Sequence, residues 1–159
     1  ACRSELIIAD EPTTALDVTI QAQVMELLMD IKQKMHTSLI VVTHNLGLVS
    51  RYADRIYVMY AGSIVESGTT EDILTTPYHP YTKGLLKAVP RLEDSTEEEL
   101  VPIDGAPPSL ADLPDYCAFY PRCAYACEQC KNPGKPELIR VGEREHFAAC
   151  PLRFSEVGQ

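Results

Sequence analysis

The chain has 159 residues and 45% of them are apolar, which is enough to bury the core of one domain, or of one domain with a small appendage. Its formal net charge of −9 argues against a nucleic-acid partner, because contacts to phosphates require a basic surface. No stretch of about 18 residues is apolar throughout, which excludes a membrane-spanning helix. Because the first residues show neither a signal peptide nor an initiator methionine, we expect the chain to be the interior of a longer one.

The first predicted strand, residues 6–9, leads directly into two carboxylates. Residues 6–17 read Leu-Ile-Ile-Ala-Asp-Glu-Pro-Thr-Thr-Ala-Leu-Asp, so that the apolar run ends in Asp10 and Glu11 follows. We expect a buried strand with both carboxylates at its carboxyl end. Nucleotide-hydrolysing α/β proteins hold Mg²⁺ and the attacking water at this position. The order therefore predicts that Asp10 holds the ion and that Glu11 polarises the water.

The next helix and strand bring a histidine to the same edge. Asp17 is expected to cap a helix over residues 18–35, whose apolar side chains recur at helical spacing. A second buried strand over residues 39–42 is followed by Thr-His-Asn. In a parallel sheet this strand ends beside the first one. His44 is therefore predicted to donate a hydrogen bond to a γ-phosphate oxygen, or to hold the water together with Glu11.

The following segments continue the alternation of helices and strands, which predicts an α/β fold. A strand pair around Ala-Gly forms a predicted hairpin, and Pro-Tyr-His-Pro precedes the last helix. The predicted elements are a helix over 46–53, strands over 55–60 and 63–66, a small helix over 69–75 and a helix over 81–88.

The last third of the chain is acidic, then rich in proline and cysteine. Residues 93–99 hold five acidic side chains in seven positions, and we interpret them as a solvated linker. Five of the six cysteines follow within residues 117–150. Thiolates are soft ligands, and four of them suit an iron–sulfur cluster or a tetrahedral zinc ion. The spacing is Cys117-x5-Cys123-x3-Cys127-x2-Cys130-x19-Cys150.

The string Asp-Glu-Pro-Thr-x-x-Leu-Asp resembles the Walker B segment and D-loop of an ATP-binding-cassette (ABC) ATPase. The resemblance implies that Asp10 binds Mg²⁺, that Glu11 is the general base, and that ATP is the nucleotide. His44 resembles the switch histidine that contacts the γ-phosphate. Asp17 resembles the D-loop aspartate, which communicates across a dimer of ATPase subunits.

A second resemblance narrows the family. Residues 79–86, His-Pro-Tyr-Thr-Lys-Gly-Leu-Leu, resemble the carboxyl-terminal extension of ATPases that power importers of peptides and sometimes of nickel. His79 and Tyr81 are expected to pack this extension onto the ATPase body. In that extension an arginine directly precedes the second of four cysteines, and Arg122 occupies this place. The resemblance implies a structural [4Fe-4S] cluster, with Zn²⁺ as the alternative, held by Cys117, Cys123, Cys130 and Cys150.

One cysteine falls outside this pattern. We interpret Cys127 as a spare thiol, although it can replace Cys130 as a ligand.

The resemblance covers almost the whole chain and implies a fold and a domain plan. The fold is a partial P-loop NTPase core with a small loop-rich, cysteine-containing extension. The expected parts are the carboxyl-terminal half of an ABC ATPase domain over 1–76, a connecting helix over 77–92, an acidic linker over 93–100 and a cysteine-rich module over 101–159.

The implied function is hydrolysis of ATP to energise import of di- or oligopeptides, or of nickel, across the cytoplasmic membrane. The implied partners are a second ATPase subunit, transmembrane permease subunits and, indirectly, an external substrate-binding protein, with no nucleic acid. The implied location is peripheral, on the cytoplasmic face of the inner membrane.

The sequence contains no G-x-x-x-x-G-K-[ST] phosphate loop, so we expect this chain alone to be inactive. In folds of this class the phosphate-loop strand lies between the strands that correspond to residues 39–42 and 55–60. We therefore expect these two strands not to pair here. The alternative function is a metal- or cluster-stapled interaction module with a non-functional ATPase remnant.

Overall fold

A computed structural model shows two compact units, Ala1–Ala53 and Asp54–Gln159. Each unit contains its own sheet, the first with two strands and the second with four. The alternation of strands and helices confirms the predicted α/β class. The structure describes residues 4–88, 102–132, 134–141 and 144–152.

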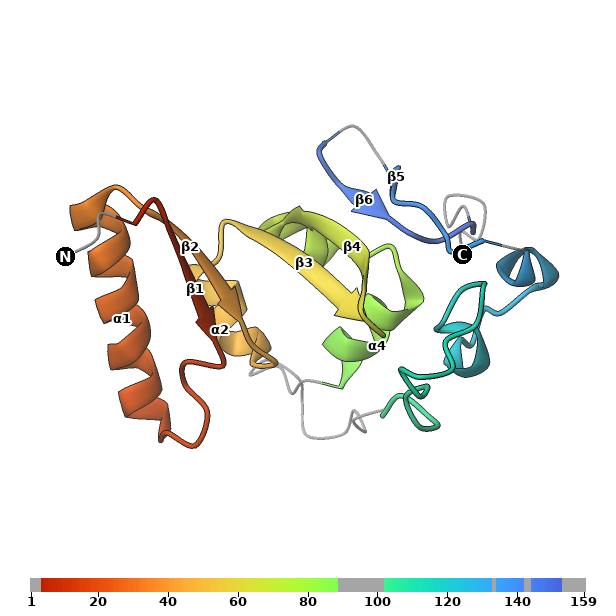
Figure 1. Ribbon diagram of the computed structural model, residues 1–159, viewed down its shortest axis with the longest axis horizontal. Helices are drawn as coiled ribbons and strands as arrows, with labels where there is room; N and C mark the ends of the chain where they lie inside the picture. The colour runs from red at the N-terminus through yellow and green to blue at the C-terminus, as the bar shows by residue number, and fades with distance from the viewer. Residues whose placement is uncertain (1–3, 89–101, 133, 142–143, 153–159) are drawn as a thin grey trace. The chain divides into compact units, whose positions relative to one another are not determined.

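The first unit pairs two parallel strands beside a long helix (Figure 1). In the parallel register Leu6 lies opposite Ser38, and Asp10 lies opposite Val42. Both strands therefore end at the same edge. The elements are β1 (Leu6–Asp10), α1 (Val18–Met35), β2 (Ser38–Val42) and α2 (Leu46–Tyr52).

Side-chain caps fix where the two helices of this unit begin. The Asp17 carboxylate accepts a hydrogen bond of 2.9 Å from the backbone N–H of Ile20, which confirms the predicted cap of α1. The Asn45 side chain accepts from the N–H of Leu48 at 3.3 Å at the start of α2. Both loops that follow the strands therefore end in a capped helix.

The prediction that β1 and β2 are buried is wrong. Their side chains alternate between exposed and half-buried, and Ile8 is 65% exposed, Ile40 49% and Val42 47%. This alternation is typical of a sheet that is covered on one face. A continuous apolar run predicts burial on both faces only where both faces have a partner.

The second unit is built on the predicted hairpin. Its strands join through Ala61 and Gly62, which both have positive φ angles, 48° and 76°. Two positive φ angles suit the tight turn of a twisted hairpin. The elements are β3 (Arg55–Tyr60), β4 (Ser63–Thr69), α3 (Thr70–Thr75), α4 (Pro80–Lys87), η1 (Tyr120–Arg122), η2 (Glu128–Lys131), β5 (Ile139–Arg140) and β6 (Phe147–Ala148).

The order of strands in this unit is β3-β4-β6-β5, so the chain after the cysteines returns to the hairpin and extends its sheet. Sequence reasoning placed no strand there, because two-residue strands leave no alternation to detect. The strand β2 belongs to the two-stranded sheet of the first unit and β3 to the four-stranded sheet of the second, and the expected slot for the phosphate-loop strand between them stays a prediction. The predicted domain boundaries stay a prediction, and the linker over 93–100 lies outside the described residues.

Aromatic rings from distant segments meet in the second unit. The ring centroids of Tyr60 and Tyr81 are 4.7 Å apart, and those of Tyr60 and Phe119 are 5.2 Å apart in an edge-to-face arrangement. His79 lies 5.9 Å from Phe119 and is 1% exposed. The hairpin, α4 and the segment around η1 therefore share one core, which agrees with the packing role expected of His79 and Tyr81.

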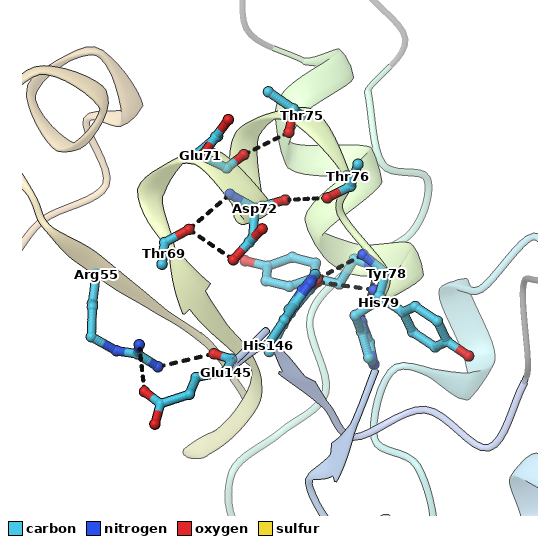
Figure 2. A network of polar contacts seen from close by, with 12 residues as sticks. Arg55, Thr69, Glu71, Asp72, Thr75, Thr76, Tyr78, His79, Glu145 and His146 are labelled. Atoms are coloured by element: carbon cyan, nitrogen blue, oxygen red, sulfur yellow. Dashed lines mark hydrogen bonds and ion pairs between the residues drawn. The ribbon is translucent and has the colours of Figure 1, made fainter. Parts of the chain in front are cut away.

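A buried carboxylate ties three segments of this unit together. Glu66 is fully buried on β4 and accepts hydrogen bonds from the backbone N–H groups of Tyr78 at 2.6 Å and His79 at 2.9 Å. It also contacts Nε2 of His146 at 2.7 Å. Tyr78, His79 and His146 converge in Figure 2. Residues up to 80 positions apart in sequence thus meet at one side chain.

Candidate functional site

The structure brings Glu11 and His44 into direct contact. Glu11 follows β1 and His44 follows β2, and Nδ1 of His44 lies 2.7 Å from Oε1 of Glu11. The parallel register, with Asp10 opposite Val42, places both residues at the carboxyl edge of the sheet. Thirty-three positions separate the pair in sequence, so strand pairing creates this contact.

The backbone holds Glu11 in an uncommon conformation. Its φ angle is 46°, in the left-handed region, which costs about 1 kcal/mol for a residue with a side chain. Its N–H donates a hydrogen bond of 2.8 Å to the carbonyl of Val42. This bond continues the β1–β2 pairing by one residue. It therefore fixes the backbone of Glu11 at the point where the chain leaves β1. Residues in strained backbone conformations cluster at active sites and ligand-binding sites.

Hydrogen bonds lower the pKa of the Glu11 carboxyl below its ordinary value, and the group is ionised at neutral pH. The hydrogen bond from His44 lowers the pKa of Glu11, and that from the Thr14 hydroxyl, at 2.9 Å, lowers it further. Desolvation opposes these effects. An ionised carboxylate accepts, so Nδ1–H of His44 is the donor. The arrangement offers a proton acceptor and a donor side by side, which is what activation of a water beside a phosphate requires.

Asp10 and Asp17 lie near this pair in sequence but differ in surroundings. Asp10 is exposed at the last position of β1, whereas Asp17 holds the first turn of α1. A carboxylate at Asp10 fits Mg²⁺ by chemistry, since that ion binds one or two carboxylates together with water and substrate phosphates. In the described part of the chain, no group of three or more His, Cys, Asp or Glu side chains is arranged to hold a metal ion. Mg²⁺ held by one carboxylate and phosphates needs no such group.

The four predicted cysteine ligands share one neighbourhood in the second unit. Burial raises the pKa of Cys150 to about 12, and the nearby thiols of Cys130, Cys117 and Cys123 raise it as well. Burial also raises the pKa of Cys130 to about 11. The thiols therefore remain protonated without a cation beside them. Thiols are the side chains that bind soft metals, but in the described part of the chain they do not converge into a ligand set.

Arg122 has a structural role that sequence spacing did not reveal. Its Nε and Nη2 donate to the carbonyls of Asp104 and Ile103, both at 2.8 Å, and Nη1 lies 3.4 Å from the hydroxyl of Tyr60. The arginine next to Cys123 therefore fastens the loop before the cysteines to the hairpin.

Sequence reasoning missed the Glu66–His146 pair. The available signal was a glutamate, Glu66, on a strand whose other residues are apolar or small (Ser63–Thr69). A charged residue in such a place indicates a buried partner, but nothing in the sequence singles out His146 as that partner.

Comparisons with known proteins found sequences similar to this chain among peptide-transport proteins. The family model for the oligopeptide/dipeptide transporter, C-terminal region, matches residues 65–130. The chain is 55% identical over 142 residues to the oligopeptide transport ATP-binding protein OppD of Haemophilus influenzae, a match that covers 89% of this chain and 44% of that protein. It is 56% identical over 146 residues to OppD of Bacillus subtilis, covering 92% and 40%.

A third relative is the dipeptide transport ATP-binding protein DppD of Haemophilus influenzae, 49% identical over 152 residues, covering 96% of this chain and 46% of that protein. The chain thus spans less than half the length of each of these relatives. The solved structure of cbiO1 from Clostridium perfringens, part of the ABC transporter complex cbiONQ, matches with a TM-score of 0.42 and 28% identity, covering 45% of this chain and 29% of that chain. None of the helices in the described segments is both long and apolar enough to cross a bilayer.

Proposed function

Because the chain is homologous over most of its length to the ATP-binding proteins of oligopeptide and dipeptide ABC transporters, we propose that it supplies the water-activating part of an ATPase subunit that drives peptide import. The observation that carries the proposal is the 2.7 Å contact between Glu11 and His44 at the carboxyl ends of two parallel strands.

Each residue at this edge has a distinct role in the proposed reaction. Glu11, ionised at neutral pH, accepts the proton of the attacking water. His44 keeps Glu11 oriented through Nδ1–H, and its Nε2, when it also carries a proton, donates a hydrogen bond to the γ-phosphate. Asp10 would hold Mg²⁺, which neutralises the phosphate charge that develops during transfer. Asp17 contacts the second ATPase subunit while it caps α1.

The partners follow from the same proposal. Two ATPase subunits enclose the nucleotide, and their closure moves the transmembrane permease subunits between access states. The chain would act as a peripheral component at the cytoplasmic face of the inner membrane. An external binding protein delivers the peptide and contacts this subunit only indirectly.

An ATPase assay on a fusion tests the proposal. The sequence has no phosphate loop, so the 159-residue chain alone is expected to show no turnover. Joined to the amino-terminal portion of OppD from Bacillus subtilis, it should bind and hydrolyse ATP. In that fusion Glu11→Gln should retain ATP while turnover falls by about 100-fold or more, because a general base contributes that much.

Glu26→Gln is the matched control, since Glu26 is an exposed carboxylate on α1 and the change is chemically the same. If Glu11→Gln hydrolyses ATP as fast as Glu26→Gln, Glu11 is not the base. If the fusion folds but never binds ATP, the chain is an interaction module with an ATPase remnant.

We further propose that Cys117, Cys123, Cys130 and Cys150 hold a structural [4Fe-4S] cluster. The supporting observation is that these thiols lie close enough to interact electrostatically. Their pKa values are raised in the absence of metal, and a bound cation would lower them and favour the thiolates. The cluster would fasten a loop-rich segment that has little regular structure of its own. Analysis of anaerobically prepared protein should find about four iron and four sulfide per chain. One zinc without sulfide would replace the cluster with a zinc site.

A further inference from the structure

Cys127 is the described thiol that the proposed cluster does not use. It precedes η2 and is half-buried, whereas Cys130 lies within η2 and is 6% exposed. The two sulfur atoms are 3.7 Å apart, and no other pair of described cysteines makes a thiol–thiol hydrogen bond.

The backbone between these two cysteines forms a tight turn. The N–H of Cys130 donates to the carbonyl of Cys127 at 3.0 Å, which brings the two residues of a C-x-x-C segment onto one side of the turn. A disulfide requires a sulfur–sulfur distance of about 2.0 Å, so the sulfurs must approach by about 1.7 Å. Rotation of a cysteine side chain about its Cα–Cβ bond displaces the sulfur by distances of this order. C-x-x-C turns of this kind occur in dithiols that oxidise and reduce reversibly.

We propose that Cys127 and Cys130 form a redox-active dithiol, which a peroxide oxidises to an intramolecular disulfide. The sulfur of the more accessible Cys127 attacks the peroxide and breaks its O–O bond. The cysteine becomes a sulfenic acid, and the released hydroxide takes up the Cys127 thiol proton and leaves as one water. The Cys130 sulfur then attacks the sulfenic sulfur and displaces a second water. Overall two thiols lose two hydrogen atoms and two electrons, and one hydrogen peroxide becomes two waters.

The disulfide has a direct consequence for the cysteine neighbourhood. Cys130 is also a proposed cluster ligand, and a sulfur in a disulfide cannot bind metal as a thiolate. Oxidation of this pair would therefore exclude metal from the site, and bound metal would protect the pair from oxidation. The inference does not depend on the cluster, because the contact between the two sulfurs exists without any metal.

Peptide mapping of the full chain tests the proposal. Protein that has been reduced and freed of metal with a chelator is treated with one equivalent of hydrogen peroxide, alkylated and digested with trypsin. Cleavage after Arg122 and Lys131 releases one peptide that contains Cys123, Cys127 and Cys130. We expect this peptide to carry one alkyl group, on Cys123, and to weigh two hydrogen atoms less than the singly alkylated peptide with two free thiols. After treatment with dithiothreitol and renewed alkylation it should carry three alkyl groups.

Two variants separate this pair from the other thiols. Cys127→Ser should abolish the disulfide and leave Cys130 alkylated, whereas Cys123→Ser should leave the disulfide intact. A cross-link from Cys130 to Cys117 or Cys150, or no disulfide in the wild-type chain, would overturn the proposal. Iron content is measured separately on untreated protein. Absence of iron would contradict the cluster proposal, whereas absence of the disulfide would contradict the dithiol proposal.

Discussion

The two units of the chain differ in where they place chemistry and where they place packing. The first unit carries the Glu11–His44 contact, yet Met25 is its one apolar side chain in the core of the described residues. The second unit holds the rest of that core together with the buried Glu66 and His79. The candidate reactive groups thus lie on the unit with little burial.

The difference shows that a reactive arrangement and a stable one have different requirements. Strand register and the hydrogen bond from the Glu11 N–H to the Val42 carbonyl set Glu11 beside His44. The second unit instead needs contacts between distant segments, because its extension has short elements and long loops. We therefore expect substitutions of buried polar groups in the second unit to have large effects on stability, and substitutions at the first unit's surface to have small ones.

The largest expected effect is that of Glu66→Gln. In glutamine an NH₂ group replaces one of the two carboxylate oxygens, each of which accepts a hydrogen bond from a backbone N–H, so at least one buried donor is left unpaired. We expect the free energy of unfolding to fall by about 3 kcal/mol. Urea denaturation of the full chain measures it.

Glu71→Gln is the matched control for this change. Glu71 lies five residues further on and pairs with Arg144 at 2.9 Å, but both side chains are mostly exposed. An exposed pair of this kind contributes at most about 1 kcal/mol. Equal losses for the two variants would show that burial of Glu66 does not govern its contribution.

The next effect is a pH dependence from His79. Burial lowers the pKa of His79 to about 4, and its Nδ1 accepts a hydrogen bond from the N–H of Tyr81, which requires the neutral ring. Protonation therefore favours the unfolded chain. The stability that His79 contributes is present above pH 6.5 and is lost as the pH falls from there toward 4. Between pH 7 and pH 5 we expect a loss of about 2 kcal/mol.

His79→Asn isolates this dependence, because asparagine accepts the same capping hydrogen bond and does not titrate. Between pH 7 and pH 5 the variant should lose about 2 kcal/mol less stability than the wild-type chain, because the contribution of His79 is absent. If both chains lose the same stability between these pH values, His79 is not the group that titrates.

The sequence predicted the elements of the first unit closely because its signals are local. An apolar run, two carboxylates, a capping aspartate and a strand-end histidine each follow from a few neighbouring residues, and parallel pairing then brings Glu11 to His44. The error was burial of the strands. Burial depends on what covers a face, which a single strand does not encode.

Prediction was weaker in the second unit because its determining contacts are not local. The hairpin and α4 follow from alternation and from Pro80 at a helix start. The pairing of β6 with β4 does not, since it depends on chain reversal through the cysteine segment. His146 meets Glu66 only as a result of that reversal. Cysteine spacing indicated a shared site but not which sulfurs touch.

A smaller effect is expected from a local interaction in the first unit. Asp17→Ala removes the side-chain acceptor at the start of α1 and leaves the N–H of Ile20 to water. Caps of this type contribute about 1 kcal/mol. Asp30→Ala, which removes an exposed pair with Lys34 on the same helix, should cost about 0.5 kcal/mol or less. Urea denaturation compares the two, and a larger loss for Asp30→Ala would contradict the capping role.

The smallest effect tests the contrast between the units most directly. Ile8 on β1 is 65% exposed and Val58 on β3 is 9% exposed, although both are β-branched residues in strands. Threonine keeps the branching and adds a hydroxyl. At Ile8 water already solvates the side chain, so Ile8→Thr should change the free energy of unfolding by less than about 0.5 kcal/mol. At Val58 the hydroxyl would be buried in an apolar core, and Val58→Thr should lose about 1–3 kcal/mol. If thermal or urea unfolding gave the opposite order, the exposed face of β1 would in solution be covered, and the first unit could no longer be regarded as the less buried of the two.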